Sequence, residues 1–568
     1  MTNKIFQTKL NSEEKVKINE FSPFFPKPKI VFKPYVQNQQ FLLPKNIDDF
    51  ISPGHIARLV SEIIGGMNIQ FITDTYLGGG TSSYEPRMML KSWILAFINR
   101  IYSCRLVAKN LRENLAFIWI SGNQTPDFHT LNNFRLRLKE DIKKIFKQIV
   151  LYGIKAGIIK GEDIFIDHTK NEANANKHKV VWKKQVEKQS AKIDVELDEL
   201  FKHIDKINEE EEKIFGNKDL PEQERQTFDA EKVAEIVDKI NQNVKKEKIS
   251  REEGREQRKK AKRTLELLQR KENYATKKQI LNGRNSYSKT DHDAVAMMMK
   301  DKLNIKPAYN EGIAVENGFV LNYVISDNCG DSVSFIPLMK GVIDNIEKVP
   351  ENANSDGAYG NEENSSFLEE KGTNNFLKYN TFHKEKSKTW RDKKFRLQDF
   401  KYNNHKDEFL CKNNIKLKLI DIVKDETGTG YIKTLSKYKA EDGYCEKCPF
   451  RDKCTSGKAR TVEVSWKAER LKKQARENLN SDKGKEMRKR RGNEVESVFG
   501  DQKMNGRKRR YHLRGKKKVN LEAGLYYIAH NIRKIQTFRK FNERFMKRNE
   551  LKELDKNLMN NLGLKITF

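Results

Sequence analysis

Cysteine is scarce in this chain, with six residues among 568. So few cysteines in this length do not make a disulfide scaffold, which excludes the small, disulfide-stapled class of secreted domains. Long apolar runs are also missing, since the most apolar one, 93–98, is too short to span a bilayer and is flanked by Lys91 and Arg100. The start, Met1 to Phe6, has no apolar segment typical of a secretion signal. We therefore expect a cytoplasmic protein with no membrane partner.

Acidic residues are the other shortage: 79 Asp and Glu stand against 111 Lys and Arg, which gives a formal net charge of +32. This excess favours a polyanionic partner such as nucleic acid. A solvated, lysine-rich surface is the alternative. However, the positive charge is clustered, with fifteen Lys and Arg against four acids between Lys483 and Lys518. Such a cluster predicts phosphate contacts, which supply affinity and salt dependence rather than sequence choice.

Residue patterns divide the chain, which is long enough for several domains. Residues 1–45 are polar and punctuated by proline, as in a flexible arm. Apolar residues at helical spacing between Asp48 and Gly157 suit a DNA-binding domain of helix-turn-helix type and a plain helical bundle almost equally. The charged segment 183–285 has sparse apolar residues at helical spacing, which favours an arm of antiparallel helices over a disordered linker. Pro221 would break a helix between its two halves.

Three acidic residues follow the pattern that a metal-dependent nucleotidyl transferase needs. Asp167 ends the apolar run 164–167, which is typical of a buried strand. Asp356 opens a sharp turn after a short, polar segment that could be a strand. Glu496 lies in a segment with a helical pattern. Strand-Asp, strand-Asp, helix-Glu is the order of the ribonuclease-H-like nucleotidyl transferases, so we predict an α/β fold with a catalytic core of that type.

The chemistry that such acids support is phosphodiester cleavage. Two divalent ions about 3.5–4 Å apart can activate the attacking water or 3′-hydroxyl and stabilise the leaving oxygen. Carboxylates are hard ligands that suit Mg²⁺ or Mn²⁺. We expect Asp167 to bridge both ions, with Asp356 and Glu496 each completing one side. On an ideal α-helix Lys503 returns to within about 20° of Glu496 and would contact the neighbouring phosphate. The alternative is a charged surface face.

The motifs around these acids resemble the DDE transposases of bacterial insertion sequences, most closely insertion-sequence family 1182 within the broader family-4-like group. The resemblance implies an Mg²⁺-dependent endonuclease and DNA nucleotidyl transferase that binds terminal inverted repeats, cleaves the strand and joins the 3′-hydroxyl end to target DNA. It also implies a homodimer on paired ends at the bacterial nucleoid. The matching segments, in the family's order, are 84–87, 103–105, 112–114, 128–131, 165–170, 172–175, Trp182, 288–291, 356–360, 363–364, 496–503, 514–515 and 529–531.

Two departures from the family concern the acids' surroundings. His168 stands where the family usually has glycine, and the strand before Asp356 is unusually polar. Neither departure removes a carboxylate, so we expect an active enzyme. The alternatives are a transposase-derived protein that binds DNA without cutting it, and a nuclease of the same fold that cuts without joining.

A third departure concerns the broader group's Tyr-x2-Arg-x3-Glu-x6-Lys signature. Glu496 and Lys503 fit it, but Lys489 and Gly492 occupy the Tyr and Arg places. Arg488 and Arg491 are the candidates to substitute. The residues that we expect to contact DNA are Lys503, Arg507, Arg509, Arg510, Arg514, Arg488 and Arg491.

A cysteine cluster follows the pattern Cys445-x2-Cys448-x5-Cys454, with Cys411 upstream. Such spacing is compatible with a closed, tetrahedral zinc site of structural type, with Cys411 as its least certain ligand. The alternative is a set of buried free thiols in a reducing cytoplasm. Of the remaining two cysteines, Cys104 lies among apolar helix residues and Cys329 in a turn.

The spacings between the three acids exceed what a minimal ribonuclease-H-like core needs, so we predict two insertions into it. The resemblance implies that the second one shapes DNA around the active site. The predicted domains are a flexible arm (1–45), a helical DNA-binding domain (46–158), the catalytic core (159–182, 286–380 and 481–545), a helical-arm insertion (183–285), a β-rich insertion with the cysteine cluster (381–480) and a tail (546–568).

Overall fold

The computed structural model describes residues 46–76, 82–215, 250–392 and 395–561, together with 238, 241, 242 and 245. The predicted arm 1–45, Pro221 and most of the second half of the predicted helical arm, 216–249, lie outside the described residues. Residues 1–49 and 50–568 form two separate units, and the second holds the elements below apart from the start of η1. In the part that is described, none of the helices is both long and apolar enough for a membrane span.

Helices dominate the first part of the chain, as the apolar spacing predicts. Their buried faces include Leu90, Ile94 and Phe97, and they share one continuous hydrophobic core with the sheet and the C-terminal helix. The elements are η1 (Ile47–Phe50), α1 (Ile56–Gly65), α2 (Gln70–Thr73), α3 (Pro86–Ile98), α4 (Cys104–Glu113), α5 (Leu115–Ile120), α6 (Phe128–Arg137) and α7 (Ile142–Lys155).

A mixed sheet follows, in which β5 pairs antiparallel with β6 and β1, while β1, β7 and β8 are parallel neighbours. The order β6-β5-β1-β7-β8 is consistent with the predicted ribonuclease-H-like core. The dipeptide Asn317-Gly318 between two apolar runs predicts a β-hairpin. The structure confirms it, because both residues have the positive φ of a tight turn between β5 and β6. The strands are β1 (Asp163–Glu172), β4 (Val295–Met298), β5 (Ile305–Glu316), β6 (Phe319–Ser326), β7 (Asn352–Ser355) and β8 (Asn374–Leu377).

Strand β7 is central although three of its four residues are polar, and all four are buried. Their side chains find partners inside the protein. Asn352 Nδ2 donates to Asp163 Oδ1 at 2.8 Å, and Asn354 Nδ2 donates to the main-chain oxygen of Phe376 at 3.3 Å. Buried polar groups are tolerated when they are hydrogen-bonded in this way. The polar segment before Asp356 is therefore a strand.

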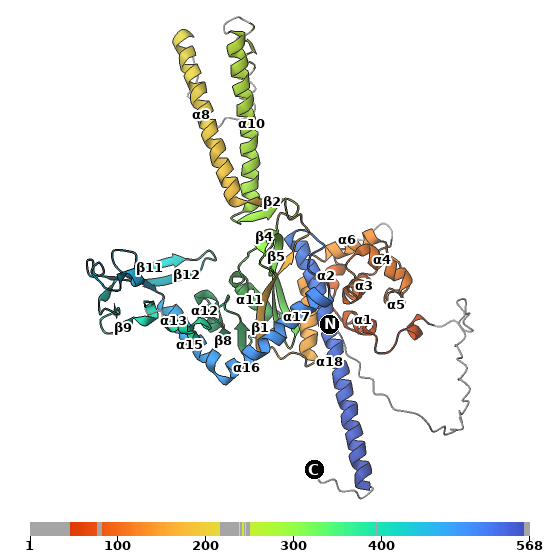
Figure 1. The fold of residues 1–568 in the computed structure, drawn as a ribbon. Helices are drawn as coiled ribbons and strands as arrows, with labels where there is room; N and C mark the ends of the chain where they lie inside the picture. Colours follow the sequence, from red (N-terminus) through yellow and green to blue (C-terminus); the bar gives the residue numbers. More distant parts are fainter. Residues whose placement is uncertain are drawn as a thin grey trace, which may run out of the picture. The chain divides into compact units, whose positions relative to one another are not determined.

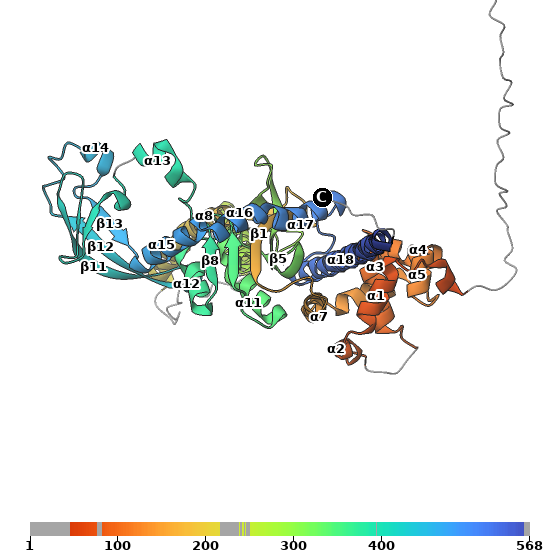
Figure 2. The same ribbon diagram turned by 90° about the horizontal axis from the view of Figure 1, so that it is seen from below.

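Helices cover both faces of this sheet (Figure 2). Helix α11 (Phe335–Ile346) packs on β5 and β6, and its apolar residues, which recur at helical spacing in the sequence, are buried. On the opposite face, α16 (Asp482–Arg491) contacts β7, and the π-turn η5 (Gly492–Glu496) contacts β1 and β5. The chain continues through α17 (Ser497–Gly500), a second π-turn η6 (Asp501–Asn505) and the long helix α18 (Lys516–Asn561).

Two long helices, α8 (Lys183–Phe215) and α10 (Arg251–Leu281), lie side by side (Figure 1). Strand β2 (Val180–Trp182) leads directly into α8, and β3 (Ser286–Ser288) follows α10. These two strands pair antiparallel at the base of the helices. Leu197 of α8 is buried with Leu267 of α10. The helices predicted for this region are thus present, and their status as an insertion into the core stays a prediction.

A second sheet, with the order β13-β12-β11-β10-β9, lies in the predicted β-rich region and has its own small core. The exposed ring of Trp466 stacks on Phe409 of that core with ring centroids 5.9 Å apart. The remaining elements of the described chain are η2 (Ser332–Ser334), α12 (Glu362–Lys371), η3 (Lys384–Lys386), α13 (Lys388–Asp392), η4 (Leu397–Asp399), β9 (Lys401–Asn403), β10 (Glu408–Leu410), β11 (Lys416–Glu426), β12 (Ile432–Ala440), α14 (Arg451–Cys454), β13 (Thr461–Val464) and α15 (Trp466–Asn480).

Candidate active site

Two of the three predicted acids lie close together at the centre of the first sheet. Asp167 is on β1, and Asp356 directly follows β7, the parallel neighbour of β1. In that pairing Phe165 lies opposite Asn354, so continuing the register by two residues brings the two acids to the same level. One guanidinium contacts both, because an Arg491 nitrogen lies 3.1 Å from Asp167 Oδ2 and 3.8 Å from Asp356 Oδ2.

The two carboxylates differ in their surroundings. The side chain of Asp167 is 16% exposed and that of Asp356 is 41% exposed. Burial raises the pKa of Asp167 above its ordinary value, against the opposing effects of Arg491 and of the His168 main-chain N–H, which donates to Asp167 Oδ1 at 2.8 Å. A bound cation would favour the charged form of this carboxyl in the same way that Arg491 does.

His168, the residue found in place of the family's glycine, links the two acid-bearing segments. Its Nδ1 lies 2.6 Å from the hydroxyl of Tyr359, three residues after Asp356. Burial lowers the pKa of His168 to about 4, so the ring is neutral at neutral pH. On the other side His168 faces Gly312, its partner on β5. A Cβ at Gly312 would lie only 2.2 Å from His168 Nε2.

The helix that carries Glu496 differs from the ideal α-helix used for the sequence prediction. A π-turn bonds residue i to residue i+5 instead of i+4 and therefore rotates the residues that follow it. Two such turns, η5 and η6, enclose the short α17. The predicted common face of Glu496 and Lys503 is not supported: Glu496 is exposed, whereas Lys503 is partly buried beside β1, where its Nζ donates to Thr169 Oγ1.

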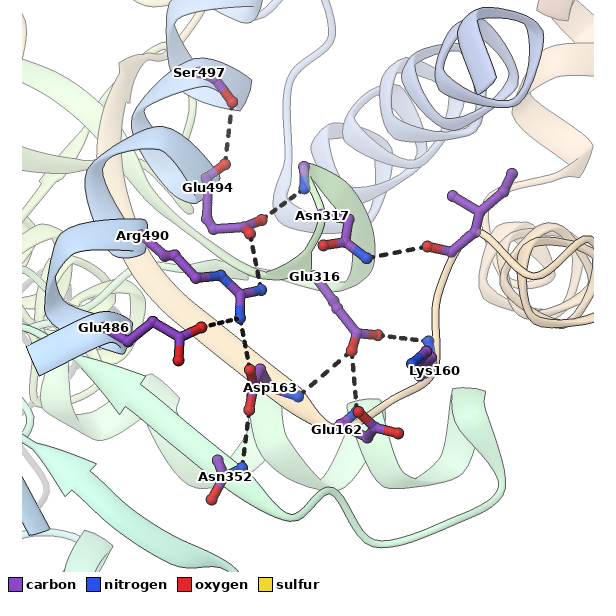
Figure 3. A network of polar contacts seen from close by, with 12 residues as sticks. Lys160, Glu162, Asp163, Glu316, Asn317, Asn352, Glu486, Arg490, Glu494 and Ser497 are labelled. Carbon is purple, nitrogen blue, oxygen red and sulfur yellow. Dashed lines mark hydrogen bonds and ion pairs between the residues drawn. The ribbon is translucent and has the colours of Figure 1, made fainter. Parts of the chain in front are cut away.

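A polar network holds α16 and η5 against the start of β1 (Figure 3). Arg490 donates to Asp163 Oδ2 at 2.7 Å and to Glu494 Oε1 at 3.3 Å. The other oxygen of Glu494 accepts the Gly318 main-chain N–H at 2.7 Å. Both carboxylate oxygens of Glu494 therefore accept hydrogen bonds that hold the fold together. Among the described contacts, Glu496 of the same turn has no such structural hydrogen bond. The network fixes the segment from which Arg491 reaches the acid pair.

A second buried network, which sequence reasoning missed, lies behind Lys503. Glu311 of β5 is fully buried. It accepts hydrogen bonds from Gln502 Nε2 at 3.1 Å, from the Tyr511 hydroxyl at 2.6 Å and from Asn171 Nδ2. These bonds tie the segment on either side of the arginine cluster to the central strands. The sequence did offer one indication of this network, a single Glu within an apolar strand pattern. A carboxylate buried in such a strand needs several hydrogen-bond donors around it.

The predicted DNA-binding residues divide by their contacts. Arg507 and Arg509 are exposed, and Arg509 Nε also donates to the main-chain oxygen of Lys503 at 3.4 Å. Arg488 donates to the main-chain oxygen of Gly484 at 3.2 Å. Arg510 and Arg514 are exposed as well, yet their guanidinium groups donate to main-chain oxygens of residues 173–175 just beyond β1. Lys503 is partly buried, and burial lowers its pKa to about 8. Arg491, expected at DNA, instead contacts the acid pair.

Two of the three predicted metal ligands are together in the structure, and the third is not grouped with them. Within the described ranges, no three His, Cys, Asp or Glu side chains are grouped closely enough to hold one ion. The donor set nevertheless fits a hard divalent cation, because two carboxylates converge on a single cationic group. Asp167 and Asp356 are brought together as the sequence predicts, and the participation of Glu496 stays a prediction.

Comparison with known families adds an independent observation. Residues 45–137 match a family model described as a transposase domain, and residues 410–536 match one described as a transposase DDE domain. These matches support an insertion-sequence transposase. No curated protein and no solved structure matches the chain. The DDE match contains Arg491, Glu496 and Lys503, and the first match covers most of the predicted helical domain; the particular insertion-sequence family stays a prediction.

Proposed function

We propose that this protein is a DDE transposase that binds the terminal inverted repeats of its element, cleaves the strand by two-metal hydrolysis and joins the 3′-hydroxyl end to target DNA. The observation that carries the proposal is the convergence of Asp167 and Asp356 on neighbouring parallel strands of the β6-β5-β1-β7-β8 sheet. The two transposase family matches support the same reading.

In this proposal Asp167, Asp356 and Glu496 hold Mg²⁺ or Mn²⁺. When bound, such ions supply Lewis-acid stabilisation of the attacking and leaving oxygens. For Glu496 to take part, its exposed side chain must turn toward β1, and Arg491 must give up its contact with Asp167. The guanidinium of Arg491 is then free for a DNA phosphate, for which its planar fork of donors is suited.

The rest of the substrate is held by positive charge. The exposed Arg507 is available to phosphates, and the exposed Arg509 can reach one if it gives up its hydrogen bond to the Lys503 main-chain oxygen. We propose that Lys503, whose Nζ donates to Thr169 Oγ1 and to the Lys170 main-chain oxygen beside Asp167, contacts the phosphate nearest the acids. Since two element ends must be joined in one reaction, we propose a homodimer on paired ends, acting in the cytoplasm on nucleoid DNA.

The test is cleavage and joining of a labelled DNA that carries the element's own terminal repeat, with Mg²⁺ present or withheld. Glu496→Gln should reduce cleavage by more than about 100-fold, beyond the 10- to 100-fold that loss of a supporting residue costs, while DNA binding is kept. Glu486→Gln is the matched control, since Glu486 is an exposed acid on the preceding helix, α16.

The other outcomes select the alternatives. Repeat binding by the wild-type protein without a metal-dependent product would favour a DNA-binding protein that does not cut. Cleaved ends without a joined product would favour a nuclease. Full cleavage by Glu496→Gln would remove Glu496 from the metal site while leaving the acid pair in place.

A further inference from the structure

Four of the six cysteines line one cavity in the second sheet's region, away from the acid pair. The cavity has a volume of about 20 Å³, which is close to the space that one water molecule needs. The four thiols are free in the structure and come from three separate segments. Cys411 directly follows β10, Cys445 and Cys448 lie in the loop after β12, and Cys454 ends α14.

The backbone around these cysteines forms the tight turns that present sulfur atoms inward. The Cys448 main-chain N–H donates to the Cys445 oxygen at 3.4 Å, and the Asn414 N–H donates to the Cys411 oxygen at 2.9 Å. A main-chain donor also reaches a sulfur directly, because the Arg460 N–H lies 3.4 Å from Cys445 Sγ. Donors of this kind orient thiolate ligands and stabilise their negative charge.

Positive charge lies beside the cluster. The guanidinium of Arg460 donates to the main-chain oxygens of Cys454 at 2.9 Å and of Phe395 at 3.1 Å, and Arg451 also lines the cavity. Four thiols that line one cavity repel one another when they are ionised unless a cation is shared between them.

We propose that Cys411, Cys445, Cys448 and Cys454 bind one structural Zn²⁺ ion, which links the three segments of the β-rich region that carry them. As the side chains stand, no three of the described residues are grouped to hold an ion. Binding of the ion requires the thiols to rotate about their Cα–Cβ bonds between staggered positions into the cavity that all four line. Four thiolates leave no open position on zinc, so the ion has no part in catalysis. The small core of this region gains its stability from the ion.

The test is the metal content of the full-length protein, purified from cells grown with zinc. We expect one zinc per chain, retained in Cys329→Ser, which removes an exposed cysteine outside the cluster, and lost in a Cys448→Ser, Cys454→Ser double variant. Replacement of zinc by Co²⁺ in the wild-type protein should give the absorption of a tetrahedral thiolate complex. This second measurement remains decisive if the double variant fails to fold.

A wild-type protein that contains no zinc, that binds iron in its place, or whose zinc content is unchanged in the double variant would overturn the proposal. Neither zinc content nor the cobalt spectrum depends on DNA cleavage, so the two proposals fail separately. Loss of cleavage with a full zinc complement speaks against the transposase reading alone.

Discussion

The imidazole of His168 and the hydroxyl of Tyr359 lie 2.6 Å apart in the buried interior, and they join the two segments that carry the candidate catalytic acids. His168 follows Asp167 on β1, and Tyr359 lies in the turn that Asp356 opens. Within the described part of the chain, Nε2 of His168 has no hydrogen-bond partner. The bond to Tyr359 is therefore the polar contact that fixes this ring, and through it the spacing of the acids.

Tyr359→Phe should lower the free energy of unfolding by roughly 1–3 kcal/mol, because it leaves a buried imidazole with both nitrogens unpaired. The same change should raise the Mn²⁺ concentration needed for half-maximal cleavage, since the turn that holds Asp356 loses its tie to β1. Urea unfolding and a metal titration of cleavage measure the two effects. Tyr444→Phe, at an exposed position, is the control. An unaltered metal requirement would limit the pair to a role in stability.

Gly312→Ala should destabilise the protein by about 1–3 kcal/mol, the usual cost of overpacking a core, because the added Cβ meets the His168 ring at 2.2 Å. In a His168→Gly background the ring is absent, so the same substitution should cost much less. A double-mutant cycle of unfolding free energies measures this coupling. Additive effects of the two changes would mean that the glycine is required for another reason.

Arg491→Gln should tighten the binding of Mn²⁺ to the DNA-free protein by about tenfold, equivalent to ~1.4 kcal/mol. The reason is that Arg491 neutralises Asp167 and Asp356 and so competes with a metal cation for them. Calorimetric titration with Mn²⁺ checks this, with Lys489→Gln, an exposed position on the same helix, as the control. Weaker binding in Arg491→Gln would instead make Arg491 a support of the metal site.

The sequence was sufficient for the features that depend on local pattern. The apolar run before Asp167, the Asn317-Gly318 turn and the amphipathic helix after β6 each have a periodicity or a turn signal that the fold confirms. These features could be predicted because neighbouring residues in the chain determine them. The convergence of Asp167 with Asp356 was expected from the order strand-Asp, strand-Asp, helix-Glu of the ribonuclease-H-like enzymes, and not from local pattern.

Features that depend on distant partners could not be predicted. The polar residues of β7 become a central strand because Asp163 and β8 offer hydrogen bonds that only the folded chain supplies. The π-turns change the face that Glu496 presents, and a helical wheel assumes a constant rotation that such turns break. The contact of Arg491 with both acids belongs to the same class, since a basic run indicates DNA as readily as it indicates an ion pair.

Asp163→Asn should destabilise the protein by about 2 kcal/mol at neutral pH, the order of a hydrogen bond to a charged group. Burial alone would raise the pKa of Asp163, but hydrogen bonds from Lys483, Asn352 and Arg490 outweigh it and lower the pKa. A lowered folded-state pKa gives stability that is present above the unfolded value, near 4, and is lost as the pH falls through the folded value.

The unfolding free energies of wild type and Asp163→Asn should therefore converge below about pH 4. Denaturant unfolding between neutral and acidic pH tests this. Asp482→Asn is the control, because Asp482 is fully exposed and its surface ion pair with Lys485 should add nothing measurable. A difference between wild type and Asp163→Asn that stays constant with pH would show that the contribution of Asp163 does not come from its charge.

Arg507→Gln and Arg510→Gln should separate DNA contact from structural support. Each phosphate contact contributes about 0.9 to the slope of log affinity against log salt, so loss of the exposed Arg507 should flatten that slope by about one without changing stability. Arg510 donates to the main-chain oxygens of Ala173 and Ala175, so its loss should also lower the unfolding free energy. The measurements are binding to a terminal-repeat duplex between low and moderate salt, and unfolding curves of both variants.

An unchanged slope in Arg507→Gln would remove this arginine from the DNA interface. Unchanged stability in Arg510→Gln would mean that its main-chain contacts contribute no net free energy.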